Sequence, residues 1–252
     1  MHPTRIRGLI MKKIFCKLVF LTFVLWSVAG LSSCSEMFPI HKGNGRLTTY
    51  EKSVAAFEKI DCEGSADVHF YASDEYRTVV TVDSNLEEFA EVFTKNNTLH
   101  IRPKRGYTCI FTKFLVEVYC PTVSEVSLSG SCNFSGKSKL VTPSFETTIS
   151  GSGKVIGTVE CDSFSAKISG SGKIAIDGVT KNANIVISGS GKFDGADFNI
   201  IEAIVKISGS GDANIWVEDI LKANISGSGK INYRGEPKID STISGSGRIR
   251  RM

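Results

Sequence analysis

The stretch AKISGSGKI, residues 166–174, decides the fold, because its central tetrapeptide recurs along the second half of the chain. Ser-Gly-Ser-Gly occurs six times, and a variant, Ser-Gly-Ser-Cys, precedes these copies. The first serines of the seven copies are Ser129, Ser150, Ser169, Ser188, Ser208, Ser226 and Ser244. Successive copies lie 18 to 21 residues apart. A period this regular indicates one supersecondary unit that is repeated seven times.

The residues before each tetrapeptide alternate between apolar and polar, which is typical of a strand with one buried face. The predicted inward rows are Phe145, Thr147, Ile149; Phe164, Ala166, Ile168; Ala183, Ile185, Ile187; Ala203, Val205, Ile207; and Leu221, Ala223, Ile225. After each tetrapeptide an apolar residue recurs at a fixed offset, as Val155, Ile174, Phe193, Ala213, Ile231 and Ile249. This second set predicts a further inward position beyond a corner.

Sharp corners between strands explain the glycines, because a residue with a Cβ loses about 1 to 2 kcal/mol at positive φ. One unit of 18 to 21 residues cannot enclose a core, whereas stacked units form continuous apolar rows. We therefore predict an all-β fold, a parallel β-helix or β-solenoid of about seven rungs. A flexible Gly-Ser linker is disfavoured, because apolar residues flank each copy.

The segment 50–128 lacks the repeat and is predicted to form a β-rich N-terminal part that caps the solenoid of residues 129–252. Strands are expected at 67–71, 77–82, 98–102 and 114–119. A short helix is expected from Leu86 to Phe93, with Asn85 as its N-cap. The polar segment 34–49, with Gly43-Asn44-Gly45, is expected to be a tether.

Residues 1–33 are typical of a bacterial lipoprotein signal peptide: a basic stretch, an apolar run from Leu18 to Gly30, and Leu31-Ser32-Ser33 before Cys34. The apolar run is shorter than the roughly 20 residues that a membrane-spanning helix needs. We expect cleavage before Cys34, which would become the lipidated N-terminus and hold the protein at the membrane through its acyl chains. The alternative is an ordinary cysteine behind a plain signal peptide.

The formal charge of +4 comes from the leader, which holds five of the 30 basic residues and none of the 26 acidic ones. The mature chain therefore has a net charge near neutrality, and no nucleic-acid partner is expected. The mature part contains Cys62, Cys109, Cys120, Cys132 and Cys161. Buried thiols are favoured over bridges, and Cys109 with Cys120 is the preferred pair if a disulfide forms.

The chain resembles the bacterial head GIN domain family of auto-transporter adhesins. Phe57-Glu58-Lys59-Ile60, Leu99-His100-Ile101 and the repeated Ile-Ser-Gly-Ser-Gly-Lys carry the resemblance, which covers essentially all of the chain after the tether. The resemblance implies a β-helical fold and an adhesin-like role, and it brings no catalytic residues.

No catalytic, cofactor or metal site is predicted. Gly-Ser-Gly-Lys lacks the spacing of a phosphate loop, calcium repeats would need an Asp in every unit, and no histidine has a partner at ligand spacing. The acids Asp162, Asp177, Asp194, Asp197, Glu218 and Asp219 do not recur at one rung position. If Ala213, Ile215 and Val217 point inward, Trp216 lies outside and is the candidate ligand contact, since its ring could stack on a sugar. Packing against a neighbouring turn is the alternative.

We predict a non-enzymatic, adhesin-like lipoprotein of the cell envelope, at the outer membrane, that presents a rigid solenoid to a glycan or a protein. The alternatives are a carbohydrate-active β-helix enzyme, which would use a pair of outward carboxylates, and a structural or regulatory envelope module. The last rung carries Arg248, Arg250 and Arg251. Either these charges are expected to keep its edge strands from pairing with other chains, or the rung is expected to form an end-to-end homodimer.

Overall fold

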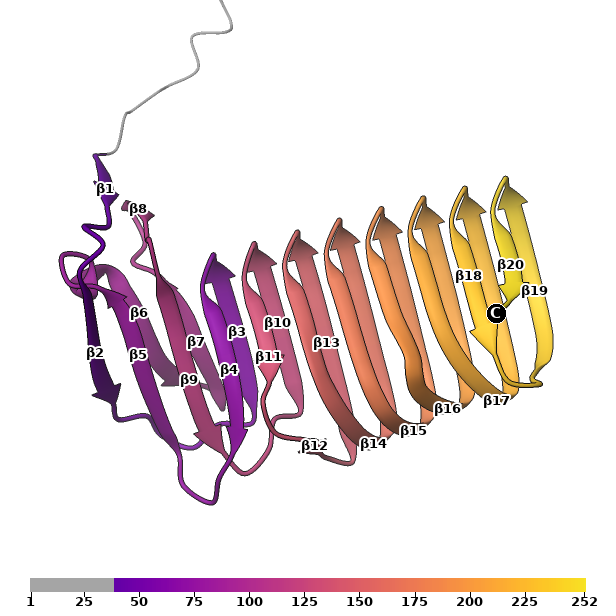
Figure 1. Cartoon of the computed structure of the whole chain (residues 1–252), viewed down its shortest axis with the longest axis horizontal. Helices are drawn as coiled ribbons and strands as arrows, with labels where there is room; N and C mark the ends of the chain where they lie inside the picture. Colours follow the sequence, from indigo (N-terminus) through magenta and orange to yellow (C-terminus); the bar gives the residue numbers. More distant parts are fainter. Residues whose placement is uncertain (1–38) are drawn as a thin grey trace, which may run out of the picture. The chain divides into compact units, whose positions relative to one another are not determined.

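The computed structural model describes residues 39–252, which form one unit built almost entirely of strands (Figure 1). The predicted signal peptide and the predicted lipidation site, Cys34, lie outside these residues. Within them, no helix has the length and the hydrophobicity that crossing a membrane requires. The N-terminal elements are β1 (Ile40–Lys42), β2 (Leu47–Lys52), β3 (Lys59–Gly64), β4 (Asp67–Ala72), β5 (Arg77–Asp83), the 3-10 helix η1 (Glu87–Phe89), β6 (Ala90–Lys95), β7 (Thr98–Pro103), β8 (Thr108–Ile110) and β9 (Phe114–Cys120).

The strands that follow form a stack of coils, with each coil paired in parallel to the one before it (Figure 1). They are β10 (Glu125–Gly130), β11 (Asn133–Gly136), β12 (Leu140–Val141), β13 (Ser144–Gly151), β14 (Lys154–Gly170), β15 (Lys173–Gly189), β16 (Lys192–Gly209), β17 (Asp212–Gly227), β18 (Lys230–Arg234), β19 (Lys238–Gly245) and β20 (Arg248–Arg251). The predicted β-solenoid of about seven turns is confirmed.

One corner of every coil is made by the repeated tetrapeptide, and its glycines lie in register through the stack. At Gly170 and Gly189 the backbone has φ of +121° and +114°, where side chains are disfavoured. A Cβ on Gly189 would also lie 2.7 Å from the carbonyl oxygen of Gly170 in the coil before. The N–H of Ser190 donates to that oxygen at 2.9 Å, so the hydrogen-bond ladder continues around the corner.

The predicted inward rows are buried, and they form one continuous core along the coils. Phe145, Phe164 and Phe193 illustrate the stacking, with ring centroids 6.2 Å and 5.9 Å apart from one coil to the next. The strand that follows each corner is less regular, since the register shifts between Ala175 and Gly178 and again between Gly195 and Asn199. These shifts absorb the differences in repeat length.

The N-terminal part contains a further coil that the repeated tetrapeptide does not mark. Strands β3 and β4 pair in parallel with β10 and β11, and Gly64 extends the glycine column through its pairing with Gly130. Its corner, Glu63-Gly64-Ser65-Ala66, shares only Gly64 and Ser65 with the repeated tetrapeptide. On the outer side of this coil lie β7 and β9, whose next neighbours, β6 and β5, run antiparallel to them. The antiparallel strands close this end of the stack.

The four strands expected between 67 and 119 are confirmed to within one residue at either end. The helix expected from Leu86 to Phe93 is wrong, because only Glu87–Phe89 is helical, as one 3-10 turn, and β6 follows it. The pairing of β6 with β7 stabilises a strand in this segment, although its local sequence has a helical pattern. Asn85 caps no helix, and its side-chain amide donates to the carbonyl of Lys42 at 2.8 Å.

Part of the segment expected to be a tether is ordered. Strand β1 pairs in parallel with β8, and β2 pairs antiparallel with β5 from Leu47 onward. The buried carboxylate of Asp83 fixes this arrangement. It accepts hydrogen bonds from the N–H of Gly45 at 2.9 Å and from the N–H of Thr112 at 2.8 Å. Residues 40–49 therefore belong to the folded unit.

Candidate ligand site

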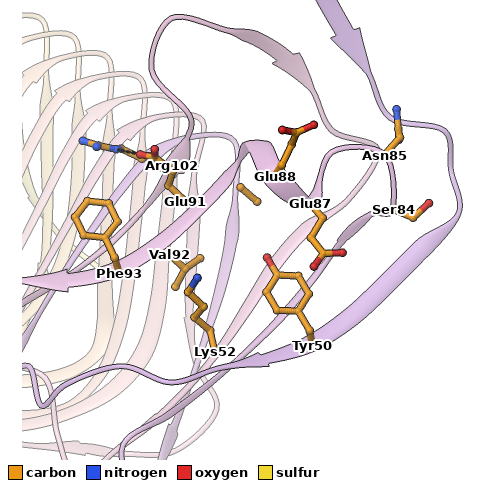
Figure 2. A pocket seen from close by; sticks show the side chains of 11 residues that line it. Tyr50, Lys52, Ser84, Asn85, Glu87, Glu88, Glu91, Val92, Phe93 and Arg102 are labelled. Carbon is orange, nitrogen blue, oxygen red and sulfur yellow. Dashed lines mark hydrogen bonds and ion pairs between the residues drawn. The ribbon is translucent and has the colours of Figure 1, made fainter.

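A groove opens at the N-terminal end of the solenoid, where β2 and β6 are the edge strands of the cap (Figure 2). Its volume is about 790 Å³. We call it the cap groove, and its lining residues are Tyr50, Lys52, Ser84, Asn85, Glu87, Glu88, Ala90, Glu91, Val92, Phe93 and Arg102. Alternation on β6 places the buried Val92 at the floor and leaves its neighbours Glu91 and Phe93 partly exposed. The groove thus has an apolar floor and polar walls.

One wall of the cap groove is held rigid by a chain of contacts on β6 and β7. The guanidinium of Arg102 donates to Glu91 at 2.8 Å and lies 5.1 Å from the centroid of the Phe93 ring. His100 stacks on the same ring at 5.1 Å, and its Nδ1 lies 3.1 Å from the Asp61 carboxylate. Neither Arg102 nor Phe93 is therefore free to collapse into the groove.

The opposite wall comes from β2 and presents Tyr50 and Lys52. Figure 2 shows the Tyr50 ring beside Glu87, with Lys52 reaching toward Val92. Burial, and then the negative charge of Glu87, raise the pKa of the Tyr50 hydroxyl, which stays protonated at neutral pH. The groove therefore offers an aromatic edge, a hydroxyl donor, carboxylate acceptors and two cationic side chains. Such a mixture suits a polar ligand with many hydroxyl groups.

Two further hollows lie over the second bend of the coils, on β14, β15 and β16, with volumes of about 690 Å³ and 310 Å³. The larger one is lined by the exposed apolar side chains of Val141, Val179 and Ile201. The smaller one is lined by polar and apolar side chains in nearly equal numbers, and its one aromatic ring, that of Phe164, is buried. Neither hollow presents a partly exposed aromatic ring beside charged groups, as the cap groove does.

Trp216 lines none of these three hollows. Its neighbours Ile215 and Val217 are fully buried, so the outward direction predicted for its side chain is confirmed. The register places it between Asn199 in the coil before and Arg234 in the coil after. Its role as a ligand contact stays a prediction.

Five of the six outward acids that an enzyme could use are engaged with neighbouring side chains. Asp194 lies 3.3 Å from the ammonium of Lys173, and Asp162 lies 2.7 Å from that of Lys181. Glu218 accepts from Asn199 at 3.1 Å. Within residues 39–252, no three His, Cys, Asp or Glu side chains are grouped so that they could hold a metal ion. No sequence motif marks the cap groove, because its residues come from segments that share no repeat.

All five cysteines between residues 39 and 252 are free thiols, and Cys62, Cys120, Cys132 and Cys161 are buried. The bridge preferred from the sequence, between Cys109 and Cys120, is wrong. Cys109 lies on β8, in a two-stranded sheet with β1, whereas Cys120 ends β9 in the large sheet, where it pairs with Ala72. A disulfide requires Cα atoms within about 7 Å.

These features define a class of protein: a single parallel β-solenoid with a β-rich N-terminal cap, a polar cap groove and a structural repeat in place of a catalytic motif. The chain belongs to the family described as "Putative auto-transporter adhesin, head GIN domain", whose model matches residues 56–237. The resemblance drawn from the sequence is confirmed. No curated protein matches the chain.

Solved structures from Parabacteroides and Bacteroides species have the same fold. One from Parabacteroides distasonis, titled a putative lipid binding protein, is 27% identical, covers 85% of this chain and 100% of its own, and has a TM-score of 0.73. A putative adhesin from Parabacteroides merdae is 26% identical, covers 84% and 99%, and has a TM-score of 0.68. A putative adhesin from Bacteroides fragilis, 20% identical with a TM-score of 0.78 over 84% and 99%, supports the fold alone.

Proposed function

We propose that this protein is a non-enzymatic, adhesin-like lipoprotein of the outer membrane, anchored through Cys34, that binds an extracellular or envelope glycan in the cap groove. The family description supports the adhesin-like role, and the leader supports export and lipidation. The observation that carries the proposal is the cap groove itself, where Tyr50 and Phe93 lie among fixed polar groups. Aromatic rings with such neighbours are suited to the apolar faces and hydroxyl groups of sugars.

Direct binding tests the proposal. Residues 39–252 share one continuous core, so this fragment can be used as a soluble protein. It is expected to retain a subset of glycans on an array, and Tyr50→Ala with Phe93→Ala should weaken that binding at least tenfold, since stacking contacts dominate such sites. Trp216→Ala is the matched control on the side of the coils. Loss of binding only in Trp216→Ala would move the site to the coils.

The two alternatives predict other outcomes of the same experiment. A carbohydrate-active enzyme would shorten the bound glycans, and replacement of a pair of outward acids would abolish that cleavage. A structural or regulatory envelope module would bind no glycan and would show its role as an envelope defect on deletion. Anchoring is tested separately: Cys34→Ala should release the protein from the membrane fraction, since the acyl chains would be lost.

We also propose that two copies pair end to end through β19. Among residues 39–252 this strand is hydrogen-bonded only to β17, and its inward-facing residues Ile239 and Ile243 are 40% and 43% exposed. An antiparallel pair about a two-fold axis at Ser241 would bring Ile239 of one copy opposite Ile243 of the other. In that register no like charges face each other along the strand. Light scattering on dilute protein should show a dimer, and Ser241→Pro should yield monomers.

A further inference from the structure

The inner corner of the solenoid contains a recurring contact between a glycine and an isoleucine of the preceding coil. A Cβ on Gly172 would lie 2.6 Å from Cγ2 of Ile149 and 3.3 Å from its Cβ. The same contact recurs, at 2.5 to 2.6 Å and 3.3 to 3.4 Å, at four later corners: Gly191 with Ile168, Gly211 with Ile187, Gly229 with Ile207, and Gly247 with Ile225. No side chain fits at this position above an isoleucine, which is why the repeat keeps its second glycine.

The first two corners of the repeat depart from this rule. At Gly153 the atoms nearest to an added Cβ are backbone atoms of Cys132 and not of Leu128, and at the first corner both sides of the contact differ. Cys132 stands at the position of the second glycine, since Asn133 pairs with Lys154 and Lys154 with Lys173. The residue that faces it from the coil before is Cys62, which pairs with Leu128 in the column of the isoleucines. The glycine and the isoleucine have thus been replaced together by two cysteines.

The two thiols meet in the interior. Both cysteines are fully buried, and their side chains are hydrogen-bonded to each other. Sγ of Cys62 lies 4.0 Å from the carbonyl oxygen of Ala66, and Sγ of Cys132 lies 3.7 Å from that of Ser129. If this corner follows the five corners from Gly172 to Gly247, its two Cβ atoms lie 3.3 to 3.4 Å apart. Disulfides have Cβ atoms about 3.8 Å apart, within a range of 3.5 to 4.5 Å. The side chain of Cys132 would widen the separation of the two Cβ atoms slightly, and the widened separation falls in the disulfide range.

We propose that Cys62 and Cys132 are a modification site, oxidised to a disulfide that staples the coil of β3 and β4 to the first repeat coil when the protein reaches the cell envelope. The two thiols lose two protons and two electrons, and one S–S bond forms. The electron acceptor is the disulfide of an envelope thiol oxidase, which is reduced to a dithiol. The inference rests on the export assumed in the proposed function.

The folded reduced protein is a poor substrate for this step. Hydrogen bonding to Cys132 and burial raise the pKa of the Cys62 thiol, and neither sulfur is exposed. Exchange requires an accessible thiolate, so the bond forms before the two coils close on each other. It then closes a loop of roughly 70 residues, for which restriction of the unfolded chain is large.

Thiol counting tests the proposal on the full chain with its own leader. The envelope fraction is denatured in excess alkylating reagent without reductant, and its peptides are analysed by mass spectrometry. Cys62 and Cys132 are expected as one linked pair of peptides, lighter than the two thiol peptides by two hydrogen atoms, with Cys109, Cys120 and Cys161 alkylated. Alkylation of Cys62 and Cys132 overturns the proposal. If the chain is missing from the envelope, export has failed, and the same count on a chain carrying a replacement secretion signal decides the bond.

A restored repeat gives a second test. The double variant Cys62→Ile with Cys132→Gly recreates the contact found in the later coils. Strong reductant should lower the Tm of the oxidised wild type by about 10 °C and leave that of the double variant unchanged. Cys161→Ser is the matched control, because it removes another buried thiol and should keep the sensitivity to reductant. A wild-type Tm that does not change when all its thiols have become alkylatable overturns the proposed staple.

Discussion

The two ends of the solenoid face the same physical problem and treat it differently. At the N-terminal end, antiparallel strands cover the first coil, and Asp83 ties the incoming segment to them. At the other end, β19 and β20 are each paired on one side only among the described residues, and the inward column at Ile243 is 43% exposed. The difference teaches that a repeat extends a core but does not close it, since closing it requires residues that leave the repeat.

The largest effect is expected at a corner in the middle of the stack. Gly189→Val should destabilise the protein by about 4 kcal/mol, because it combines a positive φ with a Cβ only 2.7 Å from a backbone oxygen. Gly106→Val is the matched control: Gly106 has φ of +84°, and a Cβ there meets nothing within 4 Å. Thermal or denaturant unfolding measures both. Equal losses of stability in the two variants would show that the positive φ alone, and not the close approach of stacked corners, excludes side chains from these positions.

The inward column gives a direct measure of how far the core extends. Ile225 and Ile243 pair with each other in adjacent coils, but Ile225 is fully buried. Ile225→Ala should cost about 3 kcal/mol, and Ile243→Ala should cost less than about 1 kcal/mol in the monomer. If Ile243→Ala costs as much stability as Ile225→Ala, but only at protein concentrations at which the dimer forms, a second copy covers this end.

At the N-terminal end, a smaller loss of stability than at Ile225 is expected. Asp83→Ala should cost about 2 kcal/mol, because it leaves the N–H groups of Gly45 and Thr112 without their acceptor. Burial alone would raise the pKa of Asp83, but the hydrogen bonds from Thr112, Gly45 and Lys113 outweigh it and lower the pKa below the ordinary value.

The direction of that pKa shift sets the pH dependence. A carboxylate with a lowered pKa in the folded state stabilises the protein above the pKa of the unfolded chain, and this contribution disappears as the pH falls through the folded pKa. The wild type should therefore lose more stability than Asp83→Ala between pH 5 and strongly acidic pH. Parallel acid-unfolding curves would contradict this role of Asp83.

The regular coils could be predicted from the sequence in detail, down to the inward residues. Local alternation of apolar and polar residues marks inward rows such as Phe164, Ala166 and Ile168. The repeat predicts which residues lie beside them in the next coil. The N-terminal end was less predictable. The segment from Leu86 to Phe93 has a helical pattern, but pairing of β6 with β7 makes most of it a strand. The cap groove had no sequence signal, since Tyr50 and Phe93 come to line it only through the pairing of β2 with β5 and of β6 with β7.

The sequence by itself determined the period, the buried rows and the glycine corners, because each is a property of residues close together in the chain that is repeated seven times. Only the tertiary structure decided that β3 and β4 form a further coil, that β2 and β6 frame a groove, and that Cys132 lies over Cys62 instead of Cys109 joining Cys120. These relations depend on the register between distant strands, and outside the repeat a single sequence carries no local mark of that register.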